Sequence, residues 1–310
     1  MLGKHFRCFC LLLSSLLWAG TAQAADVVIV SGDRSPGYLE AAQTVVAEMG
    51  RVSDKLETQV LYLPDAPGLE ASPLIAAKVI VTLGTDALSK VLARDVRVPV
   101  VAALIPKAGY ERVLRELGRK PQAPVSALYL EQPFPRQSEL LRLALPDARK
   151  VGVLWGAESG VQAQAVQSAL QARGFELVNG YVGGGNTLFA GLKAVLDDTD
   201  VLLAIPDPQV YNGSSISNVL LATYRARVPM LAFSPAYVRA GALLSLHSTP
   251  RQIGLQAVTM ARSQLQGAAV GSQYPVDFSV VLNDHVARSL GLNLDETVLT
   301  ERLRKWERRQ

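Results

Sequence analysis

Short apolar runs alternate with stretches of helical periodicity along almost the whole chain. Residues 26–31 form an apolar, β-branched run typical of a buried strand, and residues 36–49 carry apolar side chains at helical spacing. Further strand-like runs follow at residues 58–63, 78–83, 98–104 and 125–130. Strands that are apolar on both faces and alternate with helices predict a parallel sheet covered by helices on both sides.

The same pattern begins again after residue 150. Its strand-like runs are residues 150–155, 176–182, 200–205, 229–233 and 241–246, with helical stretches between them. Two such sets in tandem predict an α/β protein with two doubly wound parallel-sheet lobes. No long linker rich in Pro, Gly or Ser separates them near residues 130–134, so we expect the lobes to be joined by a short hinge.

The last part of the chain has no lobe of its own. It contains a long amphipathic stretch at 250–266, a strand-like run at 276–282 and a helical stretch at 284–290. We therefore expect these elements to complete the two earlier sheets. The predicted lobes are residues 25–130, completed by about 248–275, and residues 131–247, completed by about 276–310.

Residues 1–24 are predicted to be a cleavable signal peptide. Lys4 and Arg7 precede an apolar run at 9–18, and Ala22-Gln23-Ala24 forms a small-residue cleavage site. The run is shorter than the roughly 20 apolar residues that span a bilayer. We therefore expect export to the periplasm, with no membrane insertion after cleavage. Both cysteines of the chain, Cys8 and Cys10, lie in this segment.

Charge and motifs argue against nucleic-acid binding and against most enzyme chemistry. The chain has 31 basic and 27 acidic residues, and its only basic cluster is the tail at 302–309. His247 and His285 lie in no metal-binding spacing, and residues 156–160 fail the Gly-x-Ser-x-Gly pattern. Dinucleotide and P-loop motifs are also missing from the sequence. We expect a protein without catalytic activity, cofactor or metal. The alternative, a secreted α/β enzyme, would need Glu158 or Asp207 as its general base.

Polar residues gather where the predicted strands end. In an open α/β sheet, ligands bind in the crevice at the carboxyl ends of the strands. Gly, Ser and Thr before a helix expose N–H and hydroxyl groups to an anion, whereas Asp and Asn accept an ammonium or hydroxyl group. Trp155 and Tyr211 would cover an apolar or ring portion of the ligand. The expected ligand contacts are Ser31, Asp33, Gly84, Thr85, Trp155, Glu158, Ser159, Asp207, Tyr211, Asn212 and Ser234. Alternatively, these residues are ordinary caps and turns.

Six stretches resemble the ABC transporter substrate-binding family, which has the type I periplasmic binding fold and includes tryptophan- and tyrosine-type receptors. They are residues 79–85, 98–101, 140–153, 202–212, 224–241 and 281–291. The resemblance implies two lobes that close on a small solute. It further implies ligand contacts from Gly84 and Thr85 in the first lobe, and from Asp207 and Ser234 in the second.

The chain departs from the amino-acid-binding members of that family at two loops. Those members tend to have an Asn-Ser pair where this chain has residues 156–160, and Pro-Asp-Asn where it has Pro206-Asp207-Pro208. These departures argue against an amino-acid ligand. Glu158 would instead favour a cationic or hydroxylated solute, or face solvent.

The sequence thus predicts a monomeric periplasmic receptor of an ABC-type importer. It would close on a small organic solute by shifting an existing open–closed equilibrium, and present the closed form to an inner-membrane ABC permease. The alternative is a periplasmic ligand sensor that docks onto a membrane kinase or an outer-membrane receptor without transport. A repressor effector domain is disfavoured, because the predicted signal peptide occupies the place of a helix-turn-helix.

Overall fold

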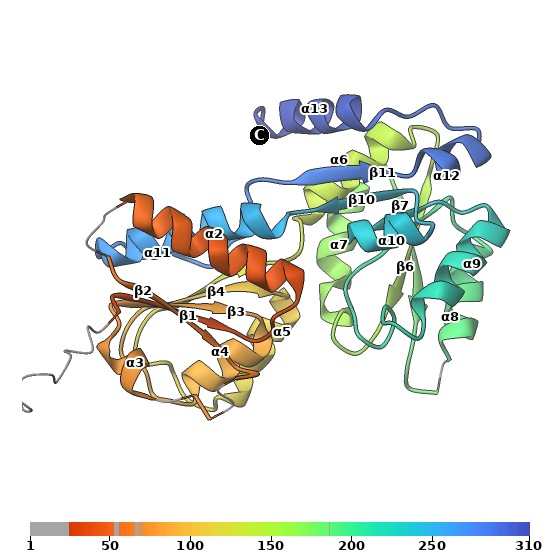
Figure 1. Ribbon diagram of the computed structural model, residues 1–310. Helices are drawn as coiled ribbons and strands as arrows, with labels where there is room; N and C mark the ends of the chain where they lie inside the picture. The colour runs from red at the N-terminus through yellow and green to blue at the C-terminus, as the bar shows by residue number, and fades with distance from the viewer. Residues whose placement is uncertain (1–24, 53–55, 66–67, 70, 186) are drawn as a thin grey trace, which may run out of the picture.

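Two lobes, each built on one β-sheet, make up the protein in the computed structural model (Figure 1). The structure describes residues 25–52, 56–65, 68–69, 71–185 and 187–310. The predicted signal peptide lies outside these residues. The prediction of an α/β protein with two parallel-sheet lobes is confirmed.

The first lobe has a sheet in the order β2-β1-β3-β4-β5, with every neighbouring pair parallel. Its strands are β1 (Val27–Ser31), β2 (Thr58–Tyr62), β3 (Val79–Leu83), β4 (Val100–Ile105) and β5 (Val125–Tyr129). Strands β1 and β3 are buried along their whole length, because both of their faces are apolar and covered by helices.

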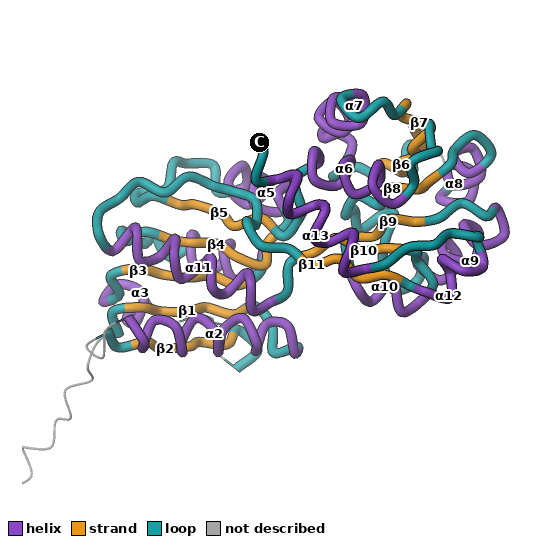
Figure 2. Tube along the Cα trace, turned by 90° about the horizontal axis from the view of Figure 1, so that it is seen from above, coloured by secondary structure: helices purple, strands orange, loops and turns teal. Residues whose placement is uncertain are grey.

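Helices cover both faces of this sheet. The helices on one face are α2 (Pro36–Val52) and α11 (Pro250–Leu265), and those on the other are α3 (Ala71–Ala76), α4 (Thr85–Leu92) and α5 (Lys107–Glu116). Figure 2 shows α2 and α11 side by side across the sheet, in agreement with their close contact. The late helix α11 therefore packs on the first lobe.

The second lobe has a sheet in the order β11-β10-β9-β8-β6-β7. Its strands are β6 (Lys150–Trp155), β7 (Glu176–Tyr181), β8 (Val201–Leu203), β9 (Met230–Ala232), β10 (Leu244–His247) and β11 (Ser279–Leu282). All neighbours are parallel except β11, which runs antiparallel to β10.

Two groups of helices cover the second sheet. The helices on one face are α6 (Phe134–Ala144), α7 (Ala163–Gln171), α12 (Asp284–Ser289) and α13 (Glu296–Glu307). Those on the other are α8 (Leu188–Leu196), α9 (Ile216–Ala226) and α10 (Pro235–Ala240). Helix α8 lies so close to β6 that a Cβ on Gly152 would lie 2.3 Å from Val195 Cγ1, and only glycine fits there.

The chain passes between the lobes three times. The first connection, residues 130–133, joins β5 to α6, and the second, residues 248–249, joins β10 to α11. The third, residues 266–278, leads from α11 to β11, which belongs to the second sheet. Short connections at one side of two rigid lobes are the arrangement that hinge motion requires.

Candidate functional site

A cavity of about 240 Å³ lies between the two lobes. Its walls are residues that follow β4 and β5 in the first lobe and β6, β8 and β9 in the second. The residues on which its chemistry depends are Pro106, Leu130, Glu131, Glu158, Tyr211 and Phe233. The crevice predicted at the carboxyl ends of parallel strands is thus present as a cavity to which both lobes contribute.

A second cavity of about 330 Å³ lies on the first lobe, where β1 and β3 end. It is lined by Gly32, Asp33, Tyr38, Gly84, Thr85 and Asp86. The Thr85 hydroxyl oxygen would lie 3.0 Å from a Cβ on Gly109, the neighbour of Ala108 in the inter-lobe cavity. The two cavities therefore adjoin along the start of α5.

The structure places Asp33, Gly84 and Thr85 together in this second cavity. Gly84 has a φ of 92°, and a Cβ there would lie 2.8 Å from the Tyr38 hydroxyl, so the turn before α4 requires glycine. The backbone N–H groups of Arg34 and Ser35 donate to Asp33 and hold the pKa of its carboxyl below its usual value. Ser31 is fully buried beside them, and its hydroxyl donates to the Asp33 carbonyl at 2.8 Å.

The carboxylate of Asp207 joins the two loops that form one wall of the inter-lobe cavity. Its Oδ2 accepts hydrogen bonds from the Glu158 N–H (3.1 Å), the Ser159 N–H (2.8 Å) and the Ser159 hydroxyl (2.8 Å). Its Oδ1 accepts from the Gln209 N–H at 2.8 Å. A Cβ on Gly156 would lie 2.3 Å from Oδ1, so glycine is required there too. Asp207 and Ser159 therefore shape the cavity wall chiefly by bonding to each other and to the backbone.

Tyr211 and Phe233 provide an aromatic wall with one unsatisfied polar atom. Their ring centroids are 5.8 Å apart, and the rings meet edge to face. The Tyr211 side chain is buried, which raises the pKa of its hydroxyl, and that hydroxyl has no hydrogen-bond partner within the described residues. Buried polar atoms in proteins are almost always hydrogen-bonded, so the absence of a partner here is an exception that a bound ligand would explain.

Glu131 lines the inter-lobe cavity although the sequence did not predict it as a ligand contact. It lies in the first connection between the lobes and is only 6% exposed. The Lys107 N–H lies 3.0 Å from both of its carboxyl oxygens, and burial raises the pKa of its carboxyl to about 7. Its position directly after a predicted strand was the signal that would have identified it.

Glu158 forms an ion pair between the lobes. Its Oε1 lies 2.5 Å from Nη1 of Arg112, which belongs to α5 of the first lobe. The sequence did not predict a role for Arg112, because nothing about an arginine in a helix indicates which loop of another lobe it will contact. This pair is one direct polar link between the two walls of the cleft.

Three of the expected contacts have other roles. Trp155 is fully buried in the core beneath α6 and α7, and its indole N–H donates to Asn179 Oδ1 at 2.7 Å. Asn212 accepts hydrogen bonds from Ser214 and Ser215 within its own turn. Ser234 caps α10 by accepting from the Ala236 N–H. Trp155 lies on the core side of its strand end, and the other two match the alternative of ordinary caps and turns.

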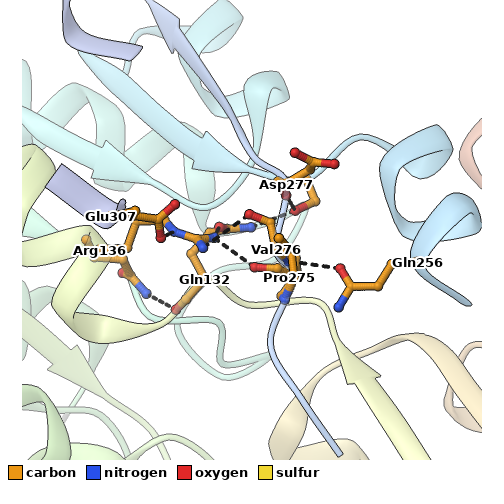
Figure 3. Close-up of polar contacts among 9 residues, drawn as sticks. Gln132, Arg136, Gln256, Pro275, Val276, Asp277 and Glu307 are labelled. Carbon is orange, nitrogen blue, oxygen red and sulfur yellow. Dashed lines mark hydrogen bonds and ion pairs between the residues drawn. The ribbon is translucent and has the colours of Figure 1, made fainter. Parts of the chain in front are cut away.

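The three connections between the lobes are hydrogen-bonded to one another (Figure 3). Arg136 Nη1 donates to Gln132 Oε1 at 2.5 Å in the first connection and to the Pro275 carbonyl at 2.9 Å in the third. The Gln132 amide donates to the Ser248 hydroxyl of the second connection at 2.8 Å. Arg136 also pairs with Glu307 of α13. One buried arginine thus connects the hinge to the C-terminal helix.

Other kinds of site are not found in the described part of the chain. It contains no group of three or more His, Cys, Asp and Glu side chains arranged to hold a metal ion. None of its helices combines the length and the apolar character needed to cross a bilayer.

Two parallel-sheet lobes, three short connections and a cavity between them define the type I periplasmic binding fold. Solved structures with this architecture include a conserved domain protein from Vibrio cholerae (20% identity, TM-score 0.61, covering 90% of this chain and 98% of that one). A second is an ABC domain in complex with L-Trp from Streptococcus pneumoniae (17%, 0.61, 89% and 98%). A third is the ligand-free, open structure of a substrate binding protein with adhesive properties from Clostridium difficile (18%, 0.67, 87% and 95%).

The sequence model of the family described as ABC transporter substrate binding protein matches residues 75–304. The chain belongs to this family. A search of curated proteins finds no significant match. The resemblance noted in the sequence is therefore confirmed, and with it the solute-binding class of the protein.

Proposed function

We propose that this protein is the periplasmic solute-binding receptor of an ABC-type importer and that its solute binds in the inter-lobe cavity. The observation that carries the proposal is the composition of that cavity. Both lobes contribute to it, and its lining includes Tyr211, whose buried hydroxyl has no partner among the described residues, and the buried carboxyl of Glu131. A solute there would satisfy polar groups that the protein leaves open.

Contacts from both lobes would make the closed form the one that binds tightly. A ligand shifts an open–closed equilibrium only by its difference in affinity for the two states. Pro106 and Leu130 on one side, with Tyr211 and Phe233 on the other, supply that difference when they meet around a solute. The closed form would then be presented to an inner-membrane ABC permease, after export directed by residues 1–24.

The test is a thermal-shift screen of the mature chain, refolded from denaturant to remove bound solute. The compounds are amino acids, nucleosides, sugars, amines and organic acids. A ligand at 100 times its dissociation constant stabilises the folded state by about 2.7 kcal/mol, which raises the melting temperature by several degrees. Tyr211→Phe should weaken the affinity for the ligand at least threefold, which appears as a smaller rise in melting temperature. Tyr224→Phe, at an exposed position on α9, should leave the affinity unchanged.

Two results would contradict the proposal at different points. If neither the compounds nor an extract of growth medium stabilises the refolded chain, the protein is not a solute receptor. If a ligand binds but a strain without this gene still takes it up at the normal rate, the importer role is wrong and a sensor role gains support.

A further inference from the structure

The charged side chains that line the cleft are acidic, and Arg112, which reaches Glu158 across it, is already paired with that residue. Among the described residues that line the inter-lobe cavity and the adjoining cavity of the first lobe, no Lys, Arg or His occurs. The acidic residues that line them are Asp33, Asp86, Glu131, Glu158 and Asp207. An anionic solute would therefore meet carboxylates along the lining, and it would have to compete with Glu158 for Arg112.

These carboxylates differ in their remaining capacity to accept hydrogen bonds or pair with a cation. Asp207 accepts four hydrogen bonds from its own loops, and Glu158 is paired with Arg112. Glu131 has no ion pair among the described residues, and its one donor from another residue is the Lys107 N–H, shared between its two oxygens. An ionised carboxylate has about four lone-pair sites, so Glu131 retains accepting capacity.

The burial of Glu131 makes a cationic ligand energetically favourable. A buried carboxyl without a counter-ion is destabilised in its charged form, and the pKa of Glu131 is raised to about 7 for this reason. A cation that reaches it supplies the missing partner and restores the charged form. The charge of Lys107 lowers the pKa of Glu131, but among the described residues its ammonium group forms no ion pair with that carboxyl. A cationic ligand would supply this direct partner.

A second observation concerns Tyr211, which lines the same cavity. Tyr211 is 6% exposed, and its hydroxyl has no hydrogen-bond partner within the described residues, although it lines the cavity with Glu131. Phe233 and Leu130 complete an apolar wall around it. Aromatic faces also attract cations, and more strongly where water is excluded. The cavity therefore combines a carboxylate, a free hydroxyl and aromatic surface.

From this arrangement we infer that the receptor selects a protonated amine with an apolar body. The ammonium group binds Glu131, and the apolar body lies against Tyr211 and Phe233. This inference rests on the proposed function, because it names the class of solute for the same cavity.

The test compares probes of equal shape and different charge by titration calorimetry at pH 8. One set is phenethylamine, 2-phenylethanol, 3-phenylpropanoate and phenylalanine, and a second is putrescine, butane-1,4-diol and succinate. We expect an amine to bind at least tenfold more tightly than its matched alcohol or carboxylate. Glu131→Gln should reduce the affinity for that amine at least tenfold. Glu301→Gln, at an exposed position on α13, should leave it unchanged.

The outcomes separate this inference from the proposed function. Equal or tighter binding of the alcohols or carboxylates would overturn the inference and leave the receptor role intact. The same holds if the amines fail to bind while the wider thermal-shift screen finds a ligand of another class. Full amine affinity in Glu131→Gln would overturn the assignment of the ammonium to this residue. If no compound binds in either experiment, the proposed function itself is wrong.

Discussion

Glu131 shows how the stability of one buried side chain is linked to its function. The carboxyl is nearly inaccessible to solvent and lies at the connection between the lobes, where its charged form has backbone donors but no ion pair among the described residues. Burying such a group is unfavourable unless something pairs with it. A residue of this kind in a cavity is a typical mark of a functional position.

The substitution Glu131→Gln should stabilise the ligand-free protein at alkaline pH. The pKa of Glu131 is about 7 in the folded state and 4.5 in the unfolded state. Its contribution to stability is fully present below pH 4.5 and is lost as the pH rises through 7, a change of about 3 kcal/mol. Urea denaturation at pH 8.5 should therefore give Glu131→Gln about 1–3 kcal/mol more stability than the native chain. An equal effect at pH 4.5 would contradict this origin.

Amine affinity should rise with pH through the same group. An alkylamine stays protonated between pH 5.5 and 8.5, whereas a carboxyl with a pKa near 7 ionises over this range, so affinity should increase up to about thirtyfold. The charged and titratable groups around Glu131 are Lys107, Glu111, Tyr274, Glu158 and Asp207. Calorimetry on Glu131→Gln separates its contribution from theirs. A rise of the same size in that variant would assign the pH dependence to those neighbours.

At the scale of elements, Asp207 determines how the loops after β6 and β8 meet. Its two oxygens accept four hydrogen bonds, three of them from the Glu158 and Ser159 backbone and the Ser159 hydroxyl. Gly156 lets the two loops approach closely. The resemblance to the family implied that Asp207 holds the ligand directly. The hydrogen bonds favour an indirect role, in which Asp207 positions the wall that carries Tyr211 and Glu158.

The two roles of Asp207 predict different effects of Asp207→Asn. In Asp207→Asn, an NH2 group replaces one of the two carboxylate oxygens. That group is a donor and would face the N–H donors that the oxygen accepts from, so we expect the free energy of unfolding to fall by about 2–4 kcal/mol. Asp197→Asn is the matched control, because its partner Lys193 is exposed and such pairs contribute about 0.5 kcal/mol. Denaturation curves test both variants. Full stability combined with lost ligand binding in Asp207→Asn would instead support direct contact.

At the scale of the whole molecule, the three connections between the lobes are hydrogen-bonded to one another and form a single hinge unit. Arg136 links Gln132 in the first connection to the Pro275 and Val276 carbonyls in the third, and Glu307 pairs with it from α13. The side chain of Arg136 is 6% exposed. Movement of one lobe relative to the other must therefore preserve or rearrange this network.

Arg136→Met should broaden the range of lobe orientations in the ligand-free protein. The variant removes the donors of four hydrogen bonds, including the one to Glu307, and leaves the buried carbonyl of Pro275 without this donor. Both cysteines lie in residues 1–24, so spin labels on Glu116→Cys and Gln164→Cys in the chain from residue 25 report the distance between α5 and α7. Arg239→Met, at an exposed position on α10, is the control. An unchanged distance distribution in Arg136→Met would show that the network does not restrain the lobes.

The sequence by itself determined the two lobes, their strands and the sheet edge, at the carboxyl ends of the strands, where a ligand site is expected. The reason is that apolar runs and helical periodicity are patterns among residues that are neighbours in the sequence. The tertiary structure decided which side chains at that edge are free. Trp155 is the last residue of β6 and Glu131 follows β5, yet Trp155 is buried in the core under α6 while Glu131 lines the cavity. Arg112 meets Glu158 only because the lobes face each other. The partner, the burial and the pKa of a side chain depend on packing between segments that are distant in the sequence. A local sequence pattern does not indicate that packing.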